Sequence, residues 1–89
     1  MLFVIEDKSH EEHLGEFISF ETAMAELRRR AAIAWDQHPN RAPCTSWQTC
    51  GREYMISEDD TATKPRTMAR QTSVLNISAR GLDWVKAPA

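Results

Sequence analysis

The residues best suited to chemistry lie between positions 35 and 52. The stretch 43–52 reads PCTSWQTCGR and holds both cysteines of the chain, Cys44 and Cys50, on either side of Trp47. A cysteine thiolate can bind zinc, attack an electrophile or form a disulfide. This connection is therefore the candidate site. Its candidate binding residues are Trp35, Asp36, His38, Asn40, Arg41, Cys44, Trp47, Cys50 and Arg52.

A zinc site would need four nitrogen or sulfur ligands. The chain could supply His10, His13, Cys44 and Cys50, with His38 in reserve. Five residues separate the cysteines, whereas zinc sites usually place paired cysteines closer together. The stretch HEEH at 10–13 departs from the H-E-x-x-H motif, because its histidines are not one helical turn apart. We therefore expect no metal, no other cofactor and a solvated loop at 10–13.

The cysteine spacing also tests for a disulfide. If this stretch is a short helix, Pro43 suits its first turn and Gly51 its C-terminal cap. The Cα atoms of Cys44 and Cys50 would then lie about 9 Å apart along the axis. A disulfide needs Cα atoms closer than about 7 Å. A helical segment therefore forbids the bridge, and an irregular loop permits it.

We place the protein in the cytoplasm, because MLFVI is too short for a signal peptide and no apolar run could span a membrane. Thiols are normally reduced in that compartment. We therefore interpret the two cysteines as small buried residues beside a core tryptophan, Trp47. The alternative is a thiol- or metal-dependent protein, in which Arg52 and His38 supply positive charge to Cys50.

Nucleic-acid binding is a further alternative. Arg28, Arg29 and Arg30, with Arg41 and Arg52, could form a basic patch. The side chains of Trp35, Trp47 and Tyr54 could offer stacking surfaces. Three consecutive helical arginines instead indicate a solvated helix face, and the net charge of -2 is not typical of a nucleic-acid-binding chain.

The charges are unevenly distributed. Residues 1–27 carry a net charge of -6 and residues 28–52 a net charge of +4. This separation favours electrostatic attraction between the acidic and the basic segment, either within one chain or between two subunits. Asp36, Asn40, Arg41 and Arg52 could line a polar pocket, but we favour structural roles. In these, Asp36 pairs with an arginine and Asn40 bonds backbone groups in the turn.

The clearest element is a helix over 20–35. Ser19 suits its N-cap, and its apolar residues recur at helical spacing. An acid in the first turn and arginines in the last suit the helix dipole, and Glu26 and Arg30 stand at the favourable i, i+4 spacing. Strands are expected at 2–6, 53–58 and 73–79, and 80–81 breaks the last one. Residues 16–19 could add a second short strand.

These elements predict a single α+β domain over 1–89. It has a small antiparallel sheet of three or four strands, with one main α-helix on one face, in β-α-β-β order. Only 16 residues are Ile, Leu, Val or Phe, so the core is thin. With Tyr54 or Val74 on the uncovered face of the sheet, the chain would favour a homodimer.

No functional family is recognised, and only size and style resemble those of short bacterial proteins. The function that we expect is a non-enzymatic binding or accessory domain. It would act as a homodimer or with a protein partner, without a membrane and without nucleic acid.

Overall fold

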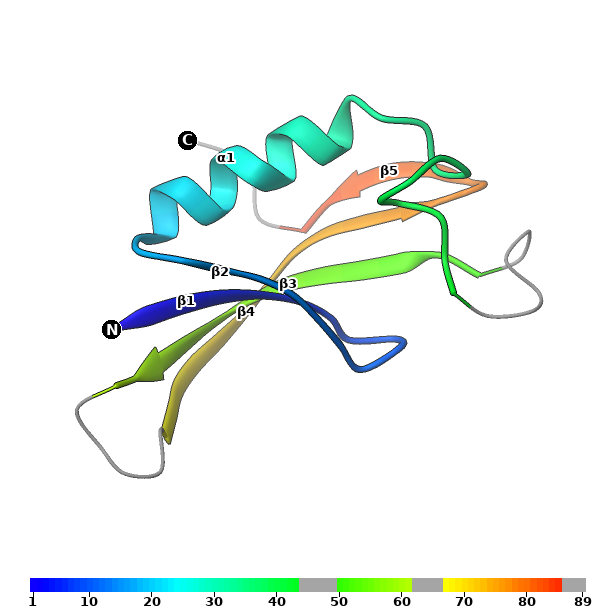
Figure 1. Cartoon of the computed structure of the whole chain (residues 1–89). Helices are drawn as coiled ribbons and strands as arrows, with labels where there is room; N and C mark the ends of the chain where they lie inside the picture. Colours follow the sequence, from blue (N-terminus) through cyan, green and yellow to red (C-terminus); the bar gives the residue numbers. More distant parts are fainter. Residues whose placement is uncertain (44–49, 62–66, 86–89) are drawn as a thin grey trace.

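The computed structural model describes residues 1–43, 50–61 and 67–85. It is an α+β fold in which one helix lies over one face of a five-stranded antiparallel sheet (Figure 1). The elements are β1 (Leu2–Asp7), β2 (Glu12–Phe17), α1 (Phe20–Ala31), β3 (Arg52–Asp60), β4 (Thr67–Ser78) and β5 (Gly81–Trp84). The spatial order is β2-β1-β3-β4-β5. The fold class is confirmed, but the expected three or four strands in β-α-β-β order are only roughly matched.

Helix α1 begins where the sequence predicts and ends earlier. The Ser19 side chain accepts a hydrogen bond from the Thr22 backbone N–H at 3.1 Å, and the Thr22 hydroxyl accepts one from the Ser19 N–H at 3.3 Å. This reciprocal pair is a capping box. The helix ends at Ala31 instead of continuing to Trp35. Its last turn tightens, because the Ile33 N–H donates to the carbonyl of Arg30, three residues back.

The core lies between α1 and the sheet. It contains Ile5, Ala23, Met24, Leu27, Tyr54, Ile56, Val74, Leu75 and Ile77. The expectation that Tyr54 or Val74 faces outward is wrong, because both are buried in this cluster. Val74 is the extra residue of a β-bulge, since Tyr54 pairs with Leu75 while Met55 pairs with Ser73. The bulge turns two consecutive residues of β4 inward.

Two strands, β2 and β4, depart most from their predicted extents. β2 begins at Glu12, so the expectation of a loop at 10–13 is wrong for Glu12 and His13, and the strand pairs with β1 around an irregularity between Ile5 and Glu6. β4 begins at Thr67, six residues before the predicted strand. The predicted break at Arg80 and Gly81 is confirmed as a tight turn, after which β5 pairs back onto β4. Gly81 has φ 121°, a conformation that glycine adopts readily.

The sheet face opposite α1 carries a row of polar side chains. Neighbours alternate faces along a strand, so Glu6, Ser57 and Gln71 project away from the core residues Ile5 and Ile56. The Ser57 hydroxyl donates to Glu6 Oε2 at 3.0 Å, and Gln71 Nε2 donates to the Ser57 oxygen at 3.4 Å. In the described part of the chain, no helix has the length and apolar character needed to cross a membrane.

Candidate functional site

Arg52 joins three parts of the chain at the start of β3. It is 7% exposed. Its Nη1 forms ion pairs with Asp7, at 2.9 Å, and with Glu12. Its Nε donates to the carbonyl of Pro39 and its Nη2 to the carbonyl of Arg41, both at 3.0 Å. One guanidinium therefore holds the last residue of β1 and the first residue of β2 against the connection that follows α1.

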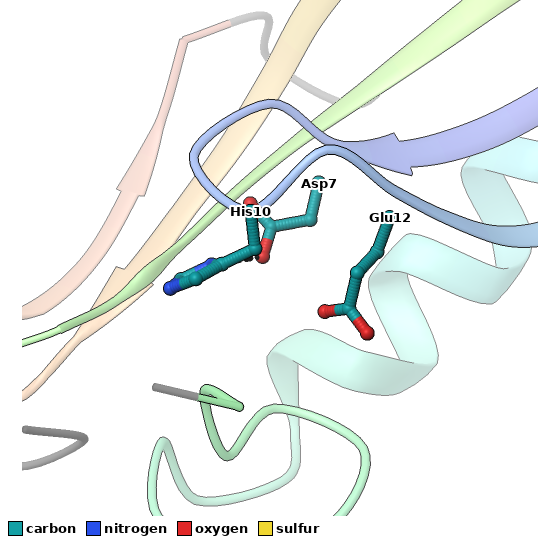
Figure 2. A group of neighbouring side chains, drawn as sticks. All are labelled: Asp7, His10 and Glu12. Carbon is teal, nitrogen blue, oxygen red and sulfur yellow. Dashed lines mark hydrogen bonds and ion pairs between the residues drawn. The ribbon is translucent and has the colours of Figure 1, made fainter. Parts of the chain in front are cut away.

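Asp7 is the buried anion of this cluster and is fully shielded from solvent. Its Oδ1 accepts from the backbone N–H groups of Ser9, at 3.0 Å, and Glu53, at 3.1 Å. Its Oδ2 lies 2.6 Å from His10 Nδ1 and also accepts from Arg52. Figure 2 shows Asp7 and His10 side by side at the β1–β2 turn. Since four partners surround the carboxylate, its role is to fix this turn and the start of β3.

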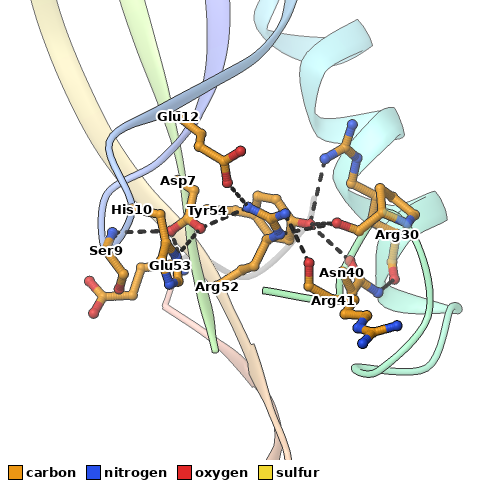
Figure 3. A network of polar contacts seen from close by, with 11 residues as sticks. Asp7, Ser9, His10, Glu12, Arg30, Asn40, Arg41, Arg52, Glu53 and Tyr54 are labelled. Carbon is orange, nitrogen blue, oxygen red and sulfur yellow. Dashed lines mark hydrogen bonds and ion pairs between the residues drawn. The ribbon is translucent and has the colours of Figure 1, made fainter. Parts of the chain in front are cut away.

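A second group of polar contacts links β3 to the end of α1 (Figure 3). The Tyr54 hydroxyl donates to Asn40 Oδ1 at 2.9 Å. Asn40 Nδ2 donates to the carbonyls of Arg30 and Ile33, both at 2.8 Å. Asn40 therefore satisfies carbonyls that the end of a helix leaves without partners. The Arg30 guanidinium carbon lies 5.4 Å from the Tyr54 ring centroid, within cation–π range.

Glu26 anchors the same corner from the helix. Its carboxylate forms ion pairs with Arg29, at 2.7 Å, and with Arg30, at 2.6 Å. The hydrogen bond from Arg29 lowers the pKa of Glu26 from 4.5 to about 2, with Arg30 acting in the same direction and partial burial against it. The predicted i, i+4 pair is confirmed. Two of the three consecutive arginines thus share one carboxylate within the helix.

Burial and charge also act on the two central side chains. Burial raises the pKa of Tyr54, and the hydrogen bond from Arg30 opposes this. Burial acts to lower the pKa of Arg52, but the hydrogen bond to Glu12 and the surrounding negative charge outweigh it, so the pKa is raised. Tyr54 therefore stays neutral and Arg52 stays charged at neutral pH.

Asp7, His10 and Glu12 form the one candidate metal cluster in the described ranges, with donor atoms within 4.8 Å of one another (Figure 2). Arg52 already bridges the two carboxylates, and His10 uses its Nδ1 on Asp7. A divalent cation would have to displace this buried guanidinium, so the geometry is that of an ion-pair cluster. The zinc set built on Cys50 is excluded as well, because this sulfur is in a disulfide and cannot act as a thiolate ligand.

The structure brings together three of the sequence-predicted residues, Asn40, Arg41 and Arg52. Arg41 takes part through its carbonyl, while its side chain is exposed. The structural role predicted for Asn40 is confirmed. Among the described residues, neither Asp36 nor His38 has an ion pair or hydrogen bond through its side chain in this network.

The remaining predicted residues lie elsewhere. Trp35 is half-buried against the core cluster. Cys44 and Trp47 fall outside the described residues. Cys50 is disulfide-bonded, so the expectation of a reduced thiol is wrong for this residue.

Sequence reasoning missed most of the network. Its unpredicted members are Asp7, His10, Glu12, Arg30 and Tyr54. One signal could have found part of it, namely the opposite charges of residues 1–27 and 28–52. The predicted internal match is confirmed in the ion pairs of Arg52 with Asp7 and Glu12.

Comparisons with known proteins add no function to this geometry. No protein-family model matches the chain, and no curated protein or solved structure matches it significantly.

Proposed function

We propose that this chain is a small non-enzymatic binding or accessory domain, which acts as a homodimer or with a protein partner. The buried polar groups of the candidate site support this proposal, because they use one another as partners. Among the described residues, no buried side-chain nitrogen or oxygen lacks a hydrogen bond. A catalytic centre usually keeps a nucleophile, base or ligand position available for substrate.

The observation that carries the proposal is the outer edge of β4. This strand runs from Thr67 to Ser78 and pairs with β3 on one side. On its other side β5 pairs only with Leu75 to Ser78. No described strand pairs with the outer edge over 67–73. An open strand edge presents backbone N–H and C=O groups that a further strand can bind.

The alternatives receive less support from the geometry. Arg29 and Arg30 are paired with Glu26, which reduces the charge available to nucleic acid. The disulfide at Cys50 favours neither a metal thiolate nor the expected cytoplasmic location, since stable disulfides are typical of oxidising compartments.

Sedimentation velocity over a wide range of protein concentration tests the proposal. We expect reversible association, seen as a sedimentation coefficient that rises with concentration. A strict monomer at the highest concentration would remove the homodimer and leave only a protein partner. Thiol titration with metal analysis on native protein tests the alternative. Bound metal, or activity that depends on a free thiol, would contradict the proposal.

A further inference from the structure

The sheet has two outer strands, β2 and β5, and one exposed stretch of an inner strand, residues 67–73 of β4. β2 carries the exposed polar side chains of His13 and Glu16 and faces a register irregularity in β1. β5 has only four residues. Short length, charge and bulges are the usual devices that prevent edge pairing. Residues 67–73 have one charged side chain, Arg70, which is ion-paired with Glu58 at 3.6 Å.

We propose that residues 69–73 of β4 pair antiparallel with the same residues of a second copy, about a two-fold axis at Gln71. This inference rests on the proposed function and names its surface. Such pairing would join two five-stranded sheets into one continuous sheet, with both α1 helices on the same face. It is an isologous contact, in which the same patch serves both copies.

The extent of the open edge limits the register. Its C-terminal limit is Val74, whose carbonyl accepts from the Val85 N–H at 2.8 Å. Its N-terminal limit is the start of β4 at Thr67. A two-fold axis perpendicular to the sheet keeps every side chain on its own face. Residues directly opposite each other share a face, so the axis must pass between a residue and the same residue of the second copy. An axis at Thr72 would leave only residues 71–73 to overlap.

The charge of Arg70 decides between the two longer registers, which have the axis at Arg70 or at Gln71. An axis at Arg70 would overlap 67–73 fully, but it would place Arg70 directly opposite its own copy. Like charges directly opposite across two strands are destabilising. An axis at Gln71 places Arg70 opposite Thr72 and Ala69 opposite Ser73. This register retains five residues of each copy and opposes no like charges.

A groove on the helix side of the sheet lies beside the same edge. It has a volume of about 310 Å³ and is lined by Phe3, Phe20, Glu58, Arg70 and Thr72. The Phe3 and Phe20 rings form an edge-to-face pair with centroids 6.4 Å apart. The end of β3 and the start of β4 extend away from α1 (Figure 1).

The charges of the groove favour a second copy as its occupant. With the axis at Gln71, Arg70 of each copy lies across Thr72 from the other copy's groove, which contains the Glu58 carboxylate. Each Glu58 already pairs with Arg70 of its own copy, so this register places the two ion pairs on the same face with Thr72 between them and brings no uncompensated charge to the contact. The low net charge of the chain, -2, adds little repulsion between copies.

Two opposite charge changes at the axis test this surface. Gln71 is exposed on the polar face of the sheet, so Gln71→Lys and Gln71→Glu leave the core intact. Each variant alone places like charges opposite each other, and we expect its dimer dissociation constant to rise about fivefold. An equimolar mixture should form a heterodimer that is tighter than either homodimer. Gln37→Lys, the same exchange at an exposed position away from β4, should leave association unchanged.

Sedimentation equilibrium and amide hydrogen exchange measure the outcome. We expect the wild type to dimerise and the exchange of residues 69–73 to slow as concentration rises. A dimer that neither Gln71 variant weakens would overturn the proposed surface but leave the binding function intact. A wild-type monomer at every concentration overturns both the surface and the homodimer. A monomer in which residues 69–73 are protected at every concentration overturns the inference, because its own chain then covers the edge.

Discussion

Asn40→Ala is the substitution that best tests how the connection is held to the fold. Asn40 is 1% exposed. It donates to the carbonyls of Arg30 and Ile33 at 2.8 Å and accepts from the Tyr54 hydroxyl at 2.9 Å. Each net hydrogen bond contributes about 1 kcal/mol, and a buried group left unpaired costs about 1–3 kcal/mol. Since water can enter the space left by the truncated side chain, we expect a total loss of about 2–3 kcal/mol.

Urea unfolding followed by circular dichroism measures this loss. For a small domain with a slope near 1 kcal/mol/M, the midpoint should fall by about 2–3 M. The matched control is Asn76→Ala, the same exchange at a half-buried position of β4 that has no side-chain hydrogen bond within the described residues. We expect this control to lose less than about 0.5 kcal/mol.

A double-mutant cycle separates the Asn40–Tyr54 contact from the helix contacts. Tyr54→Phe removes the hydroxyl that bonds Asn40 Oδ1. We expect a coupling energy of about 1 kcal/mol between the two substitutions. If Asn40→Ala costs no more than the Asn76 control, the amide does not hold the connection and the reasoning is refuted. A coupling of zero would refute only the contribution of the contact with Tyr54.

Three further predictions follow from the same contacts. Arg52→Met leaves Asp7 buried without its cation and should cost about 3–5 kcal/mol in urea unfolding, whereas Arg52→Lys should retain part of the stability. The low pKa of Glu26, about 2 against 4.5, stabilises the fold fully above pH 4.5. This contribution, about 1 kcal/mol after solvent screening, should disappear as pH falls from 4.5 toward 2, and Glu26→Gln should show no such loss. Native protein should react with no thiol reagent, and reduction of the disulfide at Cys50, whose expected partner is Cys44, should cost about 2 kcal/mol.

The sequence predicts the helix start well and its end poorly. The start depends on neighbours in the chain, since Ser19 and Thr22 are three residues apart and cap each other. The end depends on Asn40, which lies nine residues after Ala31 in the chain. Its side chain folds back and donates to the carbonyls of Arg30 and Ile33. Periodicity continues through Trp35, so the apolar pattern alone gives no reason to stop at Ala31.

The strands show the same division between local and long-range causes. Alternation places Leu75 and Ile77 in the core correctly, but Val74 joins them only because its partner strand skips a residue at the bulge. A bulge is a property of two strands and cannot be read from one. Gly51 is similar. The sequence offers Gly51 as the cap of a short helix. In the structure, a Cβ at Gly51 would lie 2.6 Å from the Ile77 carbonyl oxygen, so the glycine allows close packing against β4.

The candidate site illustrates why polar clusters are harder to predict than cores. Asn40 and Arg52 stand out because polar residues in a long connection need partners, but Asp7 lies at the end of an apolar strand and reads as a surface turn. Its burial follows from Arg52, which is 45 residues away in the chain. The segregated charge is the only sequence signal that spans this distance, and it identifies the two segments without identifying the residues.

The buried network and the outer edge of β4 lie at different places on the sheet. The ion pairs of Arg52 and the contacts of Asn40 gather where β1, β3 and the connection meet the end of α1 (Figure 3). The outer edge of residues 67–73, which no described strand pairs with, lies on the part of β4 that extends beyond the helix (Figure 1). Since the network needs no further ligand to satisfy its groups, its contribution is rigidity. A rigid sheet holds β4 in the extended form that an added strand requires, so weakening the network at Asn40 should also weaken dimerisation without any change at the edge itself.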